Sequence, residues 1–232
     1  MSDRPLDWSA LGYDADPVPG DPEVVRAGGQ GYLDMADRLD RIVASLGGVT
    51  VGGSSGSQAV SALLEGAEQV RVDAERARGR YRAAGEALVA YAFAHDLAQQ
   101  ITVQALYAAR SAKQDAASAR LLAARRDEMA EQFRASGDTD EARVWANRAS
   151  QARVDAAAAD ERVAAQKVVA AQAAADWDTA ARVAIEKIDA AAGADGLDDS
   201  WWDDWGAKVV KILASVAEWV GQVPWCGVLS GG

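Results

Sequence analysis

The stretch Asp16-Pro17-Val18-Pro19-Gly20-Asp21-Pro22 is followed by a chain without any proline from residue 23 to residue 223. Each proline fixes its own φ at about −65° and disfavours helix at the residue before it, so this stretch is extended. Proline inside a helix costs about 3 kcal/mol, so its long absence is compatible with long helices. The contrast predicts an extended, Pro/Gly/Asp-rich N-terminal segment, residues 1–22, before an all-α body.

The composition favours close helix packing over a compact core of large side chains. Alanine makes up about a quarter of the 232 residues, and there are only two phenylalanines. Small side chains let helices approach closely along a thin seam. The formal net charge of −11 argues against a nucleic-acid partner, because phosphate binding depends on Lys and Arg. The single cysteine, Cys226, excludes an internal disulfide.

The N-terminus and the hydropathy of the chain bear on its location. The sequence Met-Ser-Asp-Arg-Pro-Leu-Asp-Trp lacks the apolar region of a cleaved signal peptide. We find no run of about 18 apolar residues, so no membrane span is predicted. If the protein is secreted from the cytoplasm, we therefore expect a signal-peptide-independent route.

Three helices are predicted in a body that covers residues 23–192. Small and apolar residues alternate at spacings of three and four over about 22–46, 57–134 and 138–192. Asp21 is suited to cap the first helix, with Pro22 at its first position. Gly137 is suited to end the second helix, and Asp138 or Thr139 to cap the third.

The repeat also predicts how the helices pack. A seven-residue repeat predicts a left-handed coiled-coil seam. The first and third helices together are about as long as the second. We therefore expect an elongated antiparallel bundle, with the first helix on the first third of the second and the third helix on the rest. The predicted seam of the first helix consists of Val25, Gly28, Tyr32, Met35, Leu39, Ile42 and Leu46.

The residue patterns that catalysis needs are missing. The only histidine, His95, lies on an alanine-rich helix and is interpreted as a seam residue. A zinc site needs several Cys or His ligands, a serine nucleophile needs a Gly-x-Ser-x-Gly turn, and a phosphate loop needs a Lys after its glycines. We predict a protein that is not an enzyme and holds no cofactor or metal.

The C-terminal part, residues 193–232, differs in composition from the helical body. A glycine-containing hinge precedes Trp201, Trp202 and Trp205, which stand among four Asp. A short amphipathic helix with Trp219 on its apolar face is predicted next. This surface has three interpretations: it closes the end of the bundle, it binds a partner, or it contacts a membrane interface.

Residues 8–22 and the helical hairpin after them resemble a known family. Trp8-x-x-Leu11-Gly12, the Pro-Gly-Asp-Pro stretch and the hairpin are similar to the N-terminal delivery domain of actinobacterial type VII (ESX) secreted toxins. That domain is related to Trp-x-Gly (WxG) helical hairpins and LXG toxins. Ser54-Ser55-Gly56 stands where the small family has its Trp-x-Gly turn. The resemblance implies a targeting motif made of Trp8, Leu11, Gly12, Asp16, Pro17, Pro19, Gly20, Asp21 and Pro22.

The resemblance implies a secretion-targeting module that binds small helical WxG-type proteins and is presented to a secretion ATPase. The chain has no Tyr-x-x-x-Asp/Glu signal, which in the family a small partner can supply. Residues 193–232 would then be the junction to an effector domain outside this chain. The alternatives are an intracellular coiled-coil scaffold that self-assembles, and a membrane-entry module that uses the Trp-rich helix.

Overall fold

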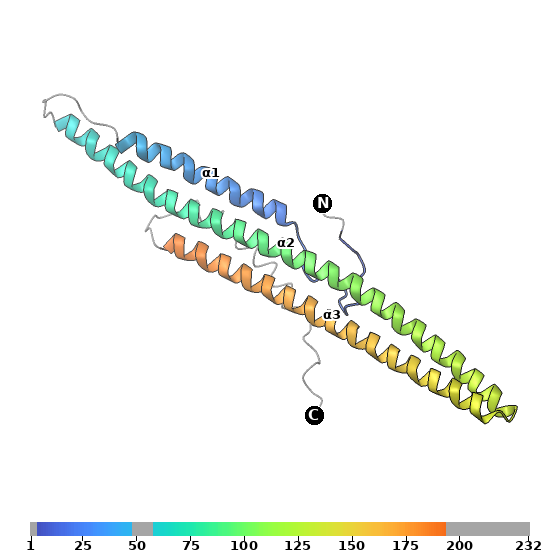
Figure 1. Ribbon diagram of the computed structural model, residues 1–232. Helices are drawn as coiled ribbons and strands as arrows, with labels where there is room; N and C mark the ends of the chain where they lie inside the picture. Colours follow the sequence, from blue (N-terminus) through green and yellow to red (C-terminus); the bar gives the residue numbers. More distant parts are fainter. Residues whose placement is uncertain (1–3, 48–57, 194–232) are drawn as a thin grey trace. The chain divides into compact units, whose positions relative to one another are not determined.

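The computed structural model describes residues 4–47 and 58–193, and the regular elements within them are helices. They are α1 (Pro22–Gly47), α2 (Gln58–Ala135) and α3 (Thr139–Gly193), shown in Figure 1. The predicted all-α class is confirmed, and so are the helix bounds to within one or two residues. The helices form two compact units, Met1–Pro19 with Ala98–Ala175 (unit 1) and Gly20–Leu97 with Asp176–Gly232 (unit 2).

The predicted helix ends are confirmed at the level of single hydrogen bonds. The Asp21 carboxylate accepts the backbone N–H of Glu23 at 2.9 Å, and α1 begins at Pro22. At the other predicted turn, Gly137 has a φ of 85°, which favours glycine. The Asp138 carboxylate then accepts the N–H of Glu141 at 3.1 Å and starts α3.

In unit 1, α2 and α3 run antiparallel on either side of the turn at Gly137, drawn yellow in Figure 1. We name residues 112–162, which include this turn, the distal hairpin. Its seam is made of alanines at the predicted spacing: Ala112, Ala116, Ala123 and Ala130 of α2, and Ala142, Ala149, Ala152, Ala156 and Ala159 of α3. Ion pairs cross the two helices beside the seam, between Arg120 and Asp160 and between Arg153 and Asp127.

In unit 2, α1 lies against α2 at a close contact between two glycines. A Cβ added to Gly85 would lie 2.8 Å from the Leu33 side chain and 2.9 Å from the Gly29 carbonyl oxygen. Only residues without a side chain allow backbones this close. Arg78 and Arg82 of α2 then pair with Asp40 of α1, at 2.7 and 2.9 Å.

The predicted seam of α1 is wrong at three positions. Gly28, Met35 and Ile42 are exposed, whereas Gly29, Tyr32 and Ala36 are buried. The physical reason is the close approach of Gly29 to α2. It rotates α1 about its axis by one residue, so that Gly29 faces α2 in place of Gly28. No atom lies within 4 Å of the place where Gly28 would carry a Cβ, so Gly28 does not contact α2.

The predicted division of α2 between its neighbours is also wrong. In unit 2, Gly29 of α1 contacts α2 at Gly85 and Val89, and Trp177 of α3 bonds Tyr91 on the same part of α2. α2 carries small residues on two faces here, so two helices pack on one stretch instead of one after the other. Comparison of helix lengths alone does not reveal this second face.

Candidate functional site: the N-terminal hook

Residues 4–19, which we name the N-terminal hook, contain a single helical turn. The carbonyl of Trp8 accepts the N–H groups of Leu11 at 3.0 Å and Tyr13 at 3.4 Å. Gly12 ends the turn with a φ of 88°, a left-handed conformation that glycine adopts without steric cost. Residues three apart share one face of a helical turn, so Trp8 and Leu11 point to the same side.

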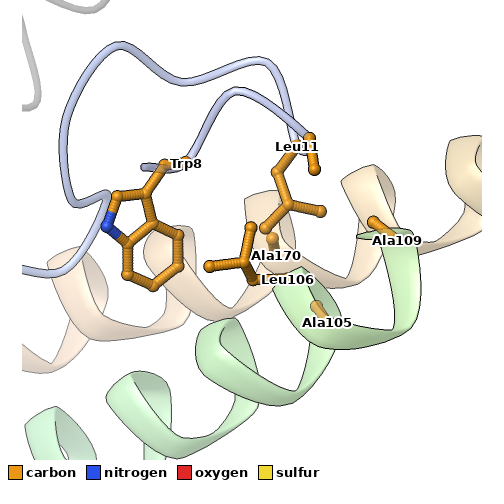
Figure 2. Close-up of a cluster of buried hydrophobic side chains, with 7 residues drawn as sticks. Trp8, Leu11, Ala105, Leu106, Ala109 and Ala170 are labelled. Atoms are coloured by element: carbon orange, nitrogen blue, oxygen red, sulfur yellow. The ribbon is translucent and has the colours of Figure 1, made fainter. Parts of the chain in front are cut away.

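This turn inserts its two large apolar side chains between α2 and α3 of unit 1, as Figure 2 shows. Trp8 is 1% exposed and Leu11 is 4% exposed. Complete burial of a large apolar side chain stabilises a fold by roughly 1.5–3 kcal/mol. We name the residues that receive them the hook seat: Ala105, Leu106 and Ala109 of α2, and Ala170 of α3.

Basic side chains of α2 hold the turn from the outside. Arg110 donates to the carbonyl of Asp7 at 2.5 Å, and Lys113 donates to the carbonyl of Ser9 at 3.3 Å. The Asp7 carboxylate in turn accepts the N–H of Ser9 at 2.9 Å. Hydrogen bonds from Ser9 lower the pKa of Asp7, with a smaller contribution from Arg110. These hydrogen bonds fix the orientation of the turn, which the buried side chains of Trp8 and Leu11 anchor.

A polar network joins both ends of the hook to α2. Arg4 donates two hydrogen bonds to the Asp16 carboxylate, at 2.5 and 2.6 Å, and a third to the backbone carbonyl of Gln99 at 3.1 Å. The Gln99 side chain donates to the carbonyl of Val18 at 3.0 Å. The network is shielded from water on the side of α2, because Gln99 is 5% exposed and Thr102 is fully buried. The hook is therefore clamped by charge as well as by apolar contact.

The residues of the predicted targeting motif occupy different environments. In unit 1, Trp8, Leu11 and Pro17 are buried, Asp16 and Pro19 are half-buried, and Gly12 is exposed. In unit 2, Gly20 has a φ of 106°, and a Cβ on it would lie 3.1 Å from Cε1 of His95. Asp21 and Pro22 start α1. The apolar members of the motif thus face the chain's own helices.

Unit 2 holds an aromatic cluster that includes the single histidine. His95 is buried, as a seam residue should be, and stacks on Trp177 with ring centroids 5.1 Å apart. The Trp177 indole N–H donates to the hydroxyl of Tyr91 at 2.9 Å. Burial raises the pKa of Tyr91 to about 12, and the bond from Trp177 offsets part of that rise. These side chains contact one another as a packed core.

Sequence reasoning missed three residues that hold the hook: Arg4, Gln99 and Leu106. A signal for two of them exists, because Gln99 and Leu106 continue a second stripe with a seven-residue spacing, after Gly85 and Ala92. All four positions of this stripe are buried. In unit 1 the stripe faces the hook, and in unit 2 Gly85 faces α1. Arg4 has no such pattern, since its role depends on a fold-back of the chain.

The other predicted site residues lie outside the described residues. These are the hairpin-turn residues Ser54 and Gly56, and the C-terminal residues Trp201, Trp202, Trp205 and Trp219. In the part of the chain that the structure describes, no group of three or more His, Cys, Asp or Glu is placed to hold a metal ion. Over the same residues, no helix is both long and apolar enough to cross a bilayer.

The site is thus a folded peptide anchored on two helices, with buried apolar anchors and a half-buried ion pair between Arg4 and Asp16. Its chemistry is that of packing and hydrogen bonding between protein segments. No known family, curated protein or solved structure matches this chain.

Proposed function

We propose that this chain is a non-catalytic targeting module of type VII secretion, which binds small helical WxG-type partners before export. One observation carries the proposal: the first part of the family-like motif, from Trp8 to Pro19, belongs to the hook, which packs on α2 and α3. Trp8 and Leu11 anchor it, and Asp16 closes its charge clamp. A motif used this way would be recognised as a surface built by hook and helices together, and not as a free peptide.

Exposed apolar residues on α2 support partner binding through a helix. In unit 2, Phe93 is 67% exposed and Leu97 is 46% exposed, one helical turn apart. Neighbours at this spacing form the apolar face by which one helix docks on another. A small helical partner would cover these side chains, and the complex would then be presented to the secretion ATPase.

An export assay with variants of the predicted targeting motif tests this function. Replacement of Pro19, Gly20 and Pro22 should abolish export, since these residues set the path from the hook into α1. The helical circular-dichroism signal should persist, because these residues lie outside α2 and α3. Leu6→Ala is the matched control, because Leu6 lies in the hook yet is 97% exposed. Normal export of the triple variant would refute the targeting role.

A second candidate, a self-assembling intracellular scaffold, fits the same exposed residues. Phe93 and Leu97 are equally suited to contact a second copy of the chain. Light scattering of the chain alone and with small helical proteins encoded beside it separates the two. A hetero-complex supports the targeting module. A homo-oligomer that ignores such partners supports the scaffold.

A further inference from the structure

The part of unit 2 farthest along α1 has an open apolar surface. We name residues 39–47 of α1 and 64–73 of α2 the hairpin tip. A groove of about 530 Å³ runs between these helices, with Val43, Leu46, Leu64 and Ala67 among its walls. Beside it, Ile42 is 46% exposed and Val70 is 55% exposed. Apolar side chains gathered on one surface mark a contact site.

α3 stops before it reaches the hairpin tip. Trp177 bonds Tyr91, and α3 continues from Trp177 for roughly four helical turns until it ends at Gly193. Since α2 and α3 are antiparallel, the same distance back from Tyr91 brings the end of α3 level with Glu75. Ala74 is buried, but among the side chains described between residues 61 and 73 none is buried. The tip therefore has one fewer helix than the stretch before it.

The chain that follows α3 has the length and pattern to fill this place. Residues 205–223 carry one apolar face with a helical repeat, formed by Trp205, Val209, Ile212, Leu213, Val216, Trp219, Val220 and Val223. As a helix they would span about 28 Å. The linker of residues 194–204 extends up to about 36 Å. The tip begins level with the end of α3 and continues for only about 17 Å along α2, so it is within reach.

Charge and tethering favour the same occupant. Lys208 and Lys211 lie on the polar face of the segment, and the tip exposes Glu65, together with Glu68, which pairs with Arg71. A short tether raises the effective concentration of the segment near its site to the millimolar range. We propose that residues 205–223 form a helix that docks on the hairpin tip of the same chain and replaces the missing third helix. This assigns the Trp-rich segment an intramolecular partner, which the proposed function leaves open.

Paired cysteines in the full-length chain test this docking. In a Cys226→Ser background, Leu64→Cys with Val216→Cys should give intramolecular cross-links with a short bismaleimide, detected by mass spectrometry. Phe93→Cys with Val216→Cys is the control, because Phe93 is exposed and also within the linker's reach. We expect at least a tenfold higher yield for the first pair. Equal yields would overturn the proposal, and so would cross-links that join only separate chains.

Hydrogen exchange provides an independent readout. Amides of residues 205–223 should be protected in the unchanged protein and lose at least tenfold protection in Val70→Asp. Val24→Asp is the control, since Val24 is 69% exposed on α1 and lies away from the tip. Exchange of this segment at the rate of an unfolded peptide would overturn the proposal. Protection that rises with protein concentration would assign the tip to a second copy and would also overturn it.

Discussion

The distal hairpin and the hook seat lie in the same unit and on the same two helices, yet their cores differ. Between residues 112 and 162 every buried residue is alanine. At the seat, Leu106 is fully buried and contacts Trp8 and Leu11 of the hook. Where two helices meet alone, small side chains fill the seam. At the seat, where the hook joins as a third segment, α2 carries the larger Leu106 to receive it.

The difference predicts where the stability of unit 1 resides. An alanine buries about one methyl group, roughly 0.8 kcal/mol, whereas a large apolar side chain contributes roughly 1.5–3 kcal/mol. The distal hairpin therefore depends on alanine's high helix propensity, and exposed ion pairs cross its two helices. The seat depends on the hook. Substitutions should then have large effects at the seat and small effects in the distal hairpin.

The largest effect is expected from Trp8→Ala. Removal of this buried side chain should lower the free energy of unfolding by about 3–5 kcal/mol. The loss cannot exceed the stability that packing of the whole hook on α2 and α3 contributes. Urea denaturation followed by circular dichroism measures the change, and limited proteolysis shows whether residues 4–19 become cleavable. Leu6→Ala should change neither reading, since Leu6 is 97% exposed. If the Trp8→Ala protein is as stable as the original, the seat does not depend on the hook for its stability.

Gly85→Ala extends the comparison to unit 2, with an effect whose sign depends on packing. The added methyl would lie 2.8 Å from Leu33 and 2.9 Å from the Gly29 carbonyl, so α1 must move away. Overpacking of this kind costs about 1–3 kcal/mol. Gly79→Ala is the matched control on α2, because nothing lies near its missing Cβ. It should instead stabilise the helix by up to about 1 kcal/mol. Equal effects of the two substitutions on the denaturation midpoint would contradict the close contact.

Alkaline pH should weaken the aromatic cluster of unit 2. The pKa of Tyr91 is raised from 10.0 to about 12 by burial. Above pH 10 the unfolded chain loses this proton while the folded chain keeps it, so stability is complete below pH 10 and falls as pH rises toward 12. The slope is at most about a tenfold change in the folding equilibrium per pH unit for one tyrosine. The denaturation midpoint of Tyr91→Phe should fall less steeply with pH than that of the original protein. An unchanged pH dependence would mean that another group causes the loss of stability at alkaline pH.

Gly137→Ala tests the turn of the distal hairpin. Nothing lies near the missing Cβ of Gly137, so the cost comes only from its φ of 85°. A left-handed conformation costs a residue with a Cβ about 1–2 kcal/mol. Gly137→Asn should cost less, because asparagine tolerates this region better. Thermal unfolding compares the two variants, and equal melting temperatures would show that the turn adopts another conformation in solution.

The residues that sequence analysis predicted correctly are those whose role is local. Asp21, Gly137 and Asp138 act on the helix end beside them, and the alanine seam repeats within each helix. The rotation of α1 was missed because it depends on Gly29 and Gly85, a glycine pair that lies far apart in the sequence and on different helices. The hook was missed because its chain reversal brings Arg4 to Gln99, a contact that periodicity does not encode.

The smallest effect is expected at the ion pairs of the distal hairpin. Arg162 and Asp115 approach to 3.1 Å, but both side chains are more than half exposed. Water screens such a pair, so a double-mutant cycle with Arg162→Ala and Asp115→Ala should give about 0.2–1 kcal/mol, and less in high salt. A seam of identical alanines can pack in several alignments of the two helices. We therefore expect these ion pairs to contribute more to the choice of register than to stability. Disulfide trapping between cysteines placed on α2 and α3 would detect slipped registers in a variant that lacks several cross-helix pairs. A single register in that variant would mean that the alanine seam alone specifies the alignment.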